Sequence, residues 1–457
     1  MTTFLPFAGQ RIAVVGLGKA GLPAALRLSV WGATVDCWDD GEARRTEAEA
    51  SGARIRDLGT APFDYDALLL SPGIPHRLPT PHPVAARAAA AGVPILCDVD
   101  FLFRAVRAAG SAARFVGITG TNGKSTTTAL LHHLLTEAGI ESEVGGNLGP
   151  PALGLKILGD AGVYTLEMSS YMLERIAAIG FNVGVMLNLS PDHLDRHGNM
   201  DGYAAAKATI FARQTATDVA VLGQDDAMSR AMAPRGPARL VPISGHARAP
   251  GGVWAEGRLL RDDAGVIGDL SVTPVLPGAH NAQNAAAAVA AALALGVDRA
   301  GVARGLATFP GLPHRQERVA EIDGVLFVND SKATNADSAE RALASYDRVV
   351  WIAGGMAKAG GIESLRPVLP RIARAFLIGR DAPLLAATLT DAGVPYEVSG
   401  TLEAAVPAAA AAARAGAAPV VLLSPACASW DQFSGFDARG DAFRSLVRSL
   451  APIGRAA

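Results

Sequence analysis

Cysteine is scarce in this chain of 457 residues. Cys37, Cys97 and Cys427 are an odd number, and their separations match neither a cysteine-based metal site nor a dense disulfide framework. We therefore expect buried free thiols and a reducing compartment, the cytoplasm.

Long apolar runs and an excess of one charge are also missing. No uninterrupted run of about 18 strongly apolar residues occurs, because Pro407, Arg414 and Gly416 break the Ala-rich segment 404–418. The first residues lack a basic region followed by a long apolar core, so we expect neither an export signal nor membrane insertion. The 41 basic and 43 acidic residues give a formal net charge of −2, which implies no general attraction to nucleic acid.

Lysine is the third rarity, because only six of the 41 basic residues are lysine. A chain that uses arginine for its solvated positive charges keeps lysine mainly where a compact ammonium or a deprotonatable amine is needed. All of them except Lys156 fall in the motifs described below. The alternative is a drift in composition with chance survivors.

The stretch 114–128, R-F-V-G-I-T-G-T-N-G-K-S-T-T-T, carries the strongest motif. A short apolar run predicts a buried strand, Gly120 and Gly123 predict a turn, and Lys124 and Ser125 open a predicted helix. This arrangement is typical of a phosphate-binding loop, in which backbone N–H groups, the lysine and a hydroxyl-bound Mg²⁺ hold a triphosphate. The spacing differs from G-x-x-x-x-G-K-S/T, and an ordinary glycine turn before a helix is the alternative.

The beginning of the chain has a second nucleotide-binding pattern. Residues 11–16 predict a strand, which is followed by G-L-G-K-A-G at 16–21, a helix, and a strand ending at Asp39. In such a βαβ unit the acid at the end of the second strand, here Asp39, is positioned to bind a ribose hydroxyl. Taken alone, the unit is a weak sign of a nicotinamide-dependent enzyme. The turn S-P-G-I-P at 71–75 follows another predicted strand, at the edge where ligands bind in such sheets.

Polar residues follow the strands after the phosphate loop. Glu167 directly follows the predicted strand 163–166, at the position where a magnesium ligand belongs. The alternative is a solvated carboxylate at the end of a strand. The loop N-L-S-P-D-H-L-D-R-H-G at 188–198 resembles a ligand cluster, with helix-capping Asp and surface His as the alternative. Asn281 and Asn284 are three residues apart and share a helix face. They are candidates for adenine or ribose contacts, and the alternative is that they are ordinary buried amides.

These patterns predict an α/β chain of three domains: a Rossmann-like domain at 1–108, a central P-loop ATPase-like domain at 109–311 and a Rossmann-like α/β domain at 312–457. The central sheet is expected to be mostly parallel, with a small antiparallel patch formed by residues 252–276. In the last domain, polar motifs again follow predicted strands, among them D-S-K-A-T-N at 330–335 and S-P-A-C-A-S-W-D-Q-F at 424–433.

The order of these motifs resembles the Mur ligase family, the ATP-dependent amide-forming enzymes of peptidoglycan assembly. The resemblance covers nearly the whole chain and includes S-P-G-I, G-T-N-G-K-S-T, G-G-N-L-G, L-E-M-S-S-Y, P-D-H-L-D-R-H, Y-A-A-A-K, H-N-A-Q-N-A, L-P-H-R, N-D-S-K-A-T-N and S-P-A-C-A-S-W-D-Q-F. Within the family it is greatest to the member that adds D-glutamate to UDP-N-acetylmuramoyl-L-alanine. The resemblance implies ATP, two Mg²⁺ ions for which Mn²⁺ can substitute, and a cytoplasmic enzyme. We expect a monomer.

The resemblance also implies roles for matched residues. The UDP-substrate is expected at Gly18, Lys19, Asp39, Gly73 and Asn147. ATP is expected at Gly120, Thr121, Asn122, Gly123, Lys124, Ser125, Thr126, Asn281, Asn284, Arg315 and Asp330. The metal ligands would be Ser125, Glu167, His193 and a carbamylated Lys207, and D-glutamate would meet Lys332, Thr334, Lys358, Ser429 and Phe436. Catalysis would rest on Lys124, Glu167, His193, Lys207 and Lys332.

The implied chemistry explains the need for these groups. The substrate carboxylate must become a leaving group, so ATP converts it into an acyl phosphate, which the amine of glutamate then attacks. Two unit charges about 4 Å apart repel by roughly 4 kcal/mol at an effective dielectric constant near 20, on the order of a thousandfold in rate. Metal ions and Lys124 would offset this repulsion.

Lys207 is unexpected as a metal ligand, because an ammonium would repel Mg²⁺. In the family, the neutral amine adds CO₂ and becomes an anionic ligand, which the always-protonated arginine cannot do. The plain alternative is an ion pair of Lys207 with Asp192 or Asp195. Three other functions fit parts of the pattern: a nicotinamide-dependent oxidoreductase, a catalytically silent nucleotide-binding scaffold, and a sibling ligase that adds L-glutamate or a diamino acid.

Overall fold

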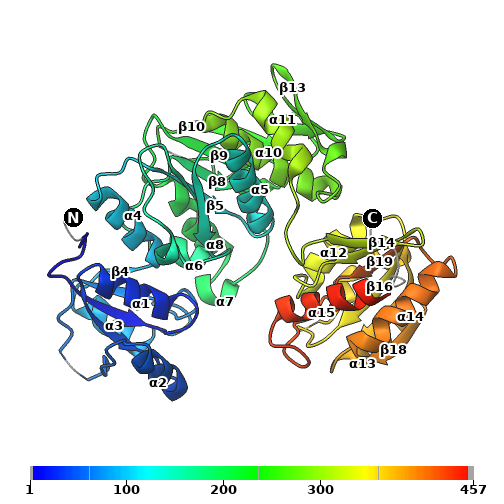
Figure 1. Cartoon of the computed structure of the whole chain (residues 1–457), viewed down its shortest axis with the longest axis horizontal. Helices are drawn as coiled ribbons and strands as arrows, with labels where there is room; N and C mark the ends of the chain where they lie inside the picture. The colour runs from blue at the N-terminus through cyan, green and yellow to red at the C-terminus, as the bar shows by residue number, and fades with distance from the viewer. Residues whose placement is uncertain (1–3, 61, 235, 359, 451–457) are drawn as a thin grey trace. The chain divides into compact units, whose positions relative to one another are not determined.

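The computed structural model describes residues 4–60, 62–234, 236–358 and 360–450. The chain forms two compact units, Met1–Thr273 with Asn281–Phe309, and Pro274–His280 with Pro310–Ala457. Figure 1 labels many of the helices and strands named below. Within the described residues, no helix is long and apolar enough to cross a membrane.

The first unit begins with a four-stranded parallel sheet in the order β2-β1-β3-β4. Apolar side chains are buried on both of its faces, as the unbroken runs in its strands predict. Its strands are β1 (Arg11–Val15), β2 (Thr34–Trp38), β3 (Ala67–Leu70) and β4 (Ile95–Leu96). Its helices are α1 (Gly21–Val30), α2 (Glu42–Ala50), α3 (Pro83–Ala90) and α4 (Asp98–Ala108).

A nine-stranded sheet forms the rest of the first unit, in the order β13-β12-β11-β10-β9-β8-β5-β7-β6. Its strands are β5 (Arg114–Thr119), β6 (Ser142–Gly146), β7 (Val163–Glu167), β8 (Val183–Met186), β9 (Val219–Gly223), β10 (Arg239–Ser244), β11 (Val253–Glu256), β12 (Leu259–Asp262) and β13 (Gly265–Asp269). Its helices are α5 (Lys124–Glu137), α6 (Ser170–Leu173), α7 (Leu194–His197), α8 (Met200–Ala208), α9 (Ala227–Arg230), α10 (Gly278–Ala294, in this unit from Asn281) and α11 (Arg299–Thr308).

The pairing in this sheet confirms the mostly parallel sheet and the antiparallel patch expected from the sequence. Strands β5 to β9 pair in parallel, whereas β12 pairs antiparallel with both β11 and β13. Strand β10, which the sequence pattern did not predict, pairs in parallel with β9 and β11. The antiparallel patch therefore begins at the β11–β12 hairpin.

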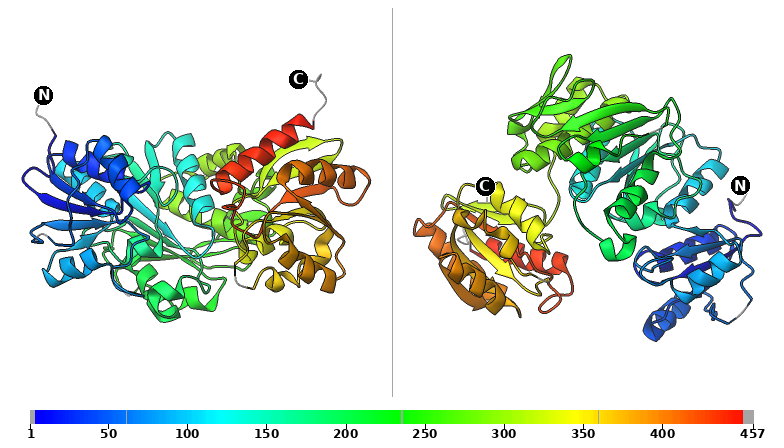
Figure 2. Two further views of the ribbon diagram at one scale, coloured as in Figure 1. Left: turned by 90° about the horizontal axis from the view of Figure 1, so that it is seen from below. Right: turned by 180° about the vertical axis from the view of Figure 1, so that it is seen from behind.

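The second unit has a six-stranded sheet in the order β14-β15-β19-β16-β17-β18, in which only β14 is antiparallel to its neighbour among the described strands. Helices cover both faces, as Figure 2 shows: α12 and α13 contribute to one buried cluster, α14 and α15 to the other. The strands are β14 (Glu317–Ile322), β15 (Val325–Asn329), β16 (Val349–Gly354), β17 (Ile372–Ile378), β18 (Tyr396–Gly400) and β19 (Val420–Leu423). The helices are α12 (Ala336–Ala344), α13 (Ala382–Asp391), α14 (Leu402–Arg414) and α15 (Phe436–Ser449). The predicted α/β fold is thus confirmed.

Candidate active site

The phosphate loop lies between β5 and α5, as the sequence predicts. Gly120 and Gly123 have φ angles of 151° and 84°, which side-chain-bearing residues rarely adopt. A Cβ atom at Gly123 would lie 2.0 Å from Oδ1 of Asn284. The loop is anchored from β8, because Thr121 and Asn122 donate their backbone N–H groups to Asn188. Glycine is therefore required here both by conformation and by space.

Ser125 and Glu167 meet at the first turn of α5. The Ser125 hydroxyl donates to Oε2 of Glu167 at 2.6 Å, and both side chains are buried. The side-chain amide of Asn147 donates to Oε1 of the same carboxylate at 2.7 Å. Thr126 follows on the same turn and is half-buried. A hydroxyl and a carboxylate in contact form the hard oxygen donor set that Mg²⁺ prefers.

Two lysines lie beside the same loop. The Lys124 ammonium donates to the carbonyls of Gly120 and Thr121 at 2.9 and 2.8 Å. Lys207, which is 1% exposed, donates to Oγ1 of Thr119 at 3.2 Å and to the carbonyl of Gly120 at 2.9 Å. Burial, and then the nearby charge of Lys124, hold the pKa of Lys207 well below its ordinary value. The protonation equilibrium of this amine is therefore shifted toward the neutral form.

The alternative ion pair of Lys207 with Asp192 or Asp195 is not formed among the residues that the structure describes. The Lys207 amine instead lies 4.8 Å from the ring centroid of Tyr203, and the His193 ring is 6.2 Å from the same ring. The two residues predicted to hold the second metal ion, Lys207 and His193, thus lie around one tyrosine. No group of three or more His, Cys, Asp or Glu residues suited to a metal gathers anywhere in the described chain.

His193 has an unusual backbone at the N-terminus of α7. Its φ of 53° and ψ of 30° are left-handed. Its Nδ1 lies 2.7 Å from the Tyr171 hydroxyl, and its Nε2 lies 3.4 Å from Oδ2 of Asp192. Burial lowers the pKa of His193, and Lys207 adds to this effect, so the neutral imidazole is favoured.

Asn281 and Asn284 lie together on α10, as their spacing predicts. The Asn284 amide donates to Oδ1 of Asn281 at 3.1 Å, and both residues are buried. Because Asn284 also touches Gly123, the structure brings this pair to the phosphate loop.

The predicted UDP-substrate residues of the first sheet follow its strands. One carboxylate oxygen of Asp39 accepts the backbone N–H of Leu17 at 2.7 Å, so the acid after β2 is joined to the turn after β1. Gly18 and Lys19 belong to this turn, and Gly73 belongs to the turn after β3. Because the strand order is β2-β1-β3, these turns lie at one edge of the sheet. Asn147, the fifth residue of this group, lies instead at Glu167.

In the second unit, Asp330 directly follows β15, and its carboxylate is buried. It accepts the Ser424 hydroxyl at 2.8 Å and the backbone N–H of Gln316 at 3.2 Å. Burial raises the pKa of Asp330 to about 7, although Arg315 acts in the opposite direction. The structure therefore places Arg315 within electrostatic reach of Asp330.

Residues predicted to meet D-glutamate come from loops at the carboxyl ends of these strands. The Lys332 ammonium lies 3.9 Å from the ring centroid of Phe436, and Thr334 donates its backbone N–H to the carbonyl of Lys332. Lys358 is exposed, Ser429 is 2% exposed, and their loops are joined by a backbone bridge between residues 356 and 428.

Sequence reasoning missed Arg439, which lies beneath these loops. It is 1% exposed, and its guanidinium donates to the hydroxyl and carbonyl of Ser331, the carbonyl of Cys427 and the carbonyl of Gly354. It therefore ties together the loops after β15, β16 and β19. Burial lowers the pKa of Arg439 to about 10.

Arg175 was missed as well, and it has a similar role in the first unit. This buried guanidinium donates to the carbonyl of Leu70, the last residue of β3, at 2.8 Å, and to the carbonyl of Ser71, the first residue of the S-P-G-I-P turn, at 3.0 Å. The Asp100 carboxylate accepts the backbone N–H groups of residues 177–179. Together these contacts fasten residues 1–108 to the larger sheet. No signal in the sequence marks Arg175 or Arg439, because the partners of each arginine are distant in the chain.

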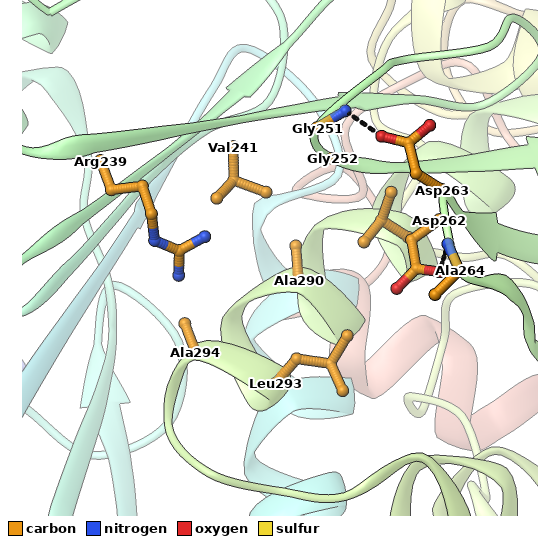
Figure 3. Close-up of a pocket in the computed structure, with 11 residues that line it drawn as sticks. Arg239, Val241, Gly251, Gly252, Asp262, Asp263, Ala264, Ala290, Leu293 and Ala294 are labelled. Atoms are coloured by element: carbon orange, nitrogen blue, oxygen red, sulfur yellow. Dashed lines mark hydrogen bonds between the residues drawn. The ribbon is translucent and has the colours of Figure 1, made fainter.

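A separate cavity of about 350 Å³ lies between the antiparallel patch and the end of α10. Figure 3 shows Arg239 at one side, Asp262 and Asp263 at the other, and Ala290 and Leu293 between them. None of the residues predicted for the active site lines this cavity.

Comparisons with known proteins agree with the geometry. Residues 118–292 match the Mur ligase middle domain, and residues 314–427 match the glutamate ligase domain of Mur ligases. A protein of Rhodospirillum rubrum named UDP-N-acetylmuramoylalanine–D-glutamate ligase is 50% identical, with 97% of this chain and 96% of that protein aligned. The chain belongs to the Mur ligase family. The resemblance in its motifs is thereby confirmed.

Other relatives extend the comparison. Proteins with the same name from Paramagnetospirillum magneticum and Caulobacter vibrioides are 49% and 48% identical, each with 98% of both chains aligned. Among solved structures, a UDP-N-acetylmuramate–alanine ligase of Thermotoga maritima has a TM-score of 0.60 at 19% identity, covering 97% of this chain and all of that one. A pseudomurein peptide ligase of Methanothermus fervidus has a TM-score of 0.55 at 18% identity, with the same coverage. These two structures support the fold.

Proposed function

We propose that this Mur ligase joins D-glutamate to UDP-N-acetylmuramoyl-L-alanine, converting ATP to ADP and phosphate. The names of the relatives support this substrate pair. The observation that carries the reaction type is the phosphate loop with the Ser125–Glu167 contact on one side and the buried amine of Lys207 on the other. We place the enzyme in the cytoplasm, as a monomer with domains at 1–108, 109–311 and 312–457.

The residues at the loop suit MgATP. Lys124, now bound to loop carbonyls, would exchange them for phosphate oxygens, and Ser125 with Glu167 would hold one Mg²⁺. His193 and Lys207 would hold a second Mg²⁺, with Mn²⁺ as a substitute for either ion. Bound metal supplies charge neutralisation for the meeting of two anions. The remaining ATP contacts would come from Thr121, Asn122, Thr126, Asn281, Asn284, Arg315 and Asp330.

Lys207 fits the second metal position only after modification. Its amine is buried, and burial lowers its pKa, which increases the fraction of neutral amine whose lone pair can add CO₂. The product is a carbamate, whose oxygens are anionic and suit Mg²⁺. We therefore propose that Lys207 is carbamylated in the active enzyme.

The chain's other groups position the two substrates. The turns that carry Gly18, Lys19, Asp39 and Gly73 would bind the UDP moiety, and Asn147 would reach the substrate from beside Glu167. A carboxylate oxygen of the substrate attacks the γ-phosphorus, and an acyl phosphate forms as ADP departs. The glutamate amine then attacks the acyl carbon, and phosphate leaves with the original carboxylate oxygen.

Glutamate carries two carboxylates, so its pocket needs cations and hydroxyls. The second unit supplies them through Lys332, Lys358, Thr334 and Ser429, with Phe436 packed against the Lys332 ammonium. Lys332 would bind one of the two carboxylates of glutamate, and this contact would orient the amine for attack.

A phosphate-release assay tests the proposal. With ATP, Mg²⁺ and UDP-N-acetylmuramoyl-L-alanine, we expect release with D-glutamate and only background release with L-glutamate, L-alanine or diaminopimelate. Lys124→Met should lose this activity, whereas Lys156→Met, which changes an exposed lysine outside the site, should keep it. Preference for L-glutamate or diaminopimelate would assign the chain to a sibling ligase instead.

A further inference from the structure

Tyr171 is surrounded by side chains of the short helix α7 and of the residue before it. Its ring centroid lies 4.9 Å from the His193 ring and 5.7 Å from the His197 ring, and the His197 ring is stacked on it. The Arg196 guanidinium lies over the same ring at 4.9 Å. The role proposed for these residues so far uses only His193, so the packing of a tyrosine against it needs its own explanation.

Arg196 restricts the movement of the Tyr171 ring. Its guanidinium donates to Oε1 of Glu174 at 3.0 Å and to the carbonyl of Ile74 at 3.1 Å, and only 6% of its side chain is exposed. Both of these bonds come from Nη2, and Nη1 donates to the carbonyl of Gly73 at 3.4 Å, so the guanidinium is held in place and supports the ring from one side through a cation–π contact. The tyrosine hydroxyl is therefore presented to His193 from a well-supported position.

His193 is held at both of its ring nitrogens. Nδ1 lies 2.7 Å from the Tyr171 hydroxyl, and Nε2 lies 3.4 Å from Oδ2 of Asp192. Its left-handed backbone, with φ of 53°, is a conformation that persists when the surroundings fix it. The contact of Nδ1 with the tyrosine has a normal hydrogen-bond distance, whereas the contact of Nε2 with Asp192 is longer, so Nε2 is the nitrogen for a cation.

The protonation of the ring decides whether Nε2 can bind a cation. A neutral imidazole carries one proton, and a metal needs the nitrogen that lacks it. A phenol hydroxyl both donates and accepts, so it can bond to Nδ1 in either tautomer. When Nε2 takes a cation, Nδ1–H can donate to the Tyr171 oxygen, and the contact is kept. Phenylalanine in this place would keep the ring packing but lose this bond.

We propose that Tyr171 is a positioning residue for His193. The Tyr171 oxygen accepts Nδ1–H of His193 and thereby directs the Nε2 lone pair of His193 toward the metal. The inference rests on the proposed function, since it takes His193 as a ligand of the second divalent cation. Partners of this kind orient metal-binding histidines, and their loss typically weakens metal affinity by about 10- to 100-fold.

The first test measures Mn²⁺ binding in the presence of ADP by electron paramagnetic resonance. We expect His193→Ala to weaken Mn²⁺ binding at one site, and Tyr171→Phe to weaken the same site by about 10-fold or more. The matched control is Tyr164→Phe, which also removes a hydrogen-bonded phenol hydroxyl but one outside the site. It should bind Mn²⁺ as the wild type does. Affinity of Tyr171→Phe within twofold of the wild type would overturn the inference.

A double variant separates positioning from general damage. If Tyr171 acts through His193, Tyr171→Phe has no further effect on Mn²⁺ affinity in the His193→Ala background. Equal effects of Tyr171→Phe in both backgrounds would overturn the inference. If His193→Ala binds Mn²⁺ as the wild type does, the metal ligand assignment of the proposed function fails, and the inference fails with it.

The second test reads the tautomer itself and needs no turnover. Nitrogen-15 spectra of histidine-labelled protein with Mg²⁺ and ADP should show the His193 proton on Nδ1, with His193→Gln identifying the signal. Tyr171→Phe should lose this preference. A proton on Nε2 in the wild-type complex would overturn the inference, while the phosphate-release assay would still decide the proposed function independently.

Discussion

Replacing Lys207 with methionine should leave the protein folded but remove its turnover, so the two effects of this lysine can be measured separately. The side chain is 1% exposed, and its pKa is held well below the ordinary value of 10.5 by burial and by Lys124. Methionine has a similar length and no charge. It loses two hydrogen bonds, to Thr119 and Gly120, each worth about 1 kcal/mol. We therefore expect a folded protein that is destabilised by roughly 2 kcal/mol at most near pH 10.

The pH dependence of this difference follows from the lowered pKa. Between the folded value and 10.5, the unfolded chain binds a proton at Lys207 that the folded chain does not. The free energy of unfolding of the wild type therefore rises with pH in that window, by about 1.4 kcal/mol per pH unit relative to Lys207→Met. Below the folded pKa, and above 10.5, the difference should no longer change with pH.

Urea unfolding of both proteins in CO₂-free buffer, over a pH series that runs down from 10.5 to 7, measures this slope and finds the pH at which it begins. Lys156→Met, at a lysine whose side chain is 82% exposed, is the control and should show no slope relative to the wild type. In ¹³C-bicarbonate buffer, a carbamate signal should appear in the wild type and be lost in both Lys207→Met and Lys207→Arg. Both variants should also lose turnover by about a hundredfold or more. A flat pH difference, or near-normal turnover of Lys207→Arg, would refute the reasoning.

Three further substitutions test other parts of the account. Gly123→Ala should abolish ADP binding in calorimetry, because its Cβ would strike Asn284, whereas Gly139→Ala, at an equally positive φ with open space around it, should bind ADP normally. Burial raises the pKa of Asp330 to about 7, so between pH 3.8 and about 7 the unfolded wild type has released a proton that the folded wild type still holds. The free energy of unfolding of the wild type should therefore fall over this range relative to that of Asp330→Asn. Equal pH profiles of the two proteins in thermal melts would contradict this. Asp100→Ala should lower the free energy of unfolding in urea by about 2–4 kcal/mol, since three backbone N–H groups lose a charged acceptor, and a loss below about 0.5 kcal/mol would count against it.

Features encoded locally could be predicted from the sequence. The strand, the turn with Gly120 and Gly123, and the helix that begins at Lys124 depend on an apolar run and on backbone freedom within fifteen residues. Glu167 could be placed because it ends a strand, and the carboxyl ends of parallel strands meet at one edge. Asn281 and Asn284 could be paired from helix geometry alone.

Features that depend on distant contacts could not be predicted. Arg175 is one of many arginines in the chain, and the carbonyls it binds lie about a hundred residues earlier. Arg439 likewise joins three loops that only the folded sheet brings together. The edge strand β14, E-R-V-A-E-I, has charged residues at half of its positions, so its apolar pattern does not stand out, although the Asp323–Gly324 turn that joins it to β15 is a local hairpin signal. Tyr171 was part of a recognised motif, but its bond to His193 depends on the left-handed backbone of that residue.

The transfer of oxygen from substrate to phosphate tests the central claim most directly. UDP-N-acetylmuramoyl-L-alanine labelled with ¹⁸O in its alanyl carboxylate is incubated with ATP, Mg²⁺ and D-glutamate, and the released phosphate is analysed by mass spectrometry. The account predicts one ¹⁸O atom in each phosphate, because a carboxylate oxygen attacks the γ-phosphorus and leaves with it. Phosphate free of ¹⁸O, formed at the rate of amide synthesis, would contradict the acyl-phosphate route.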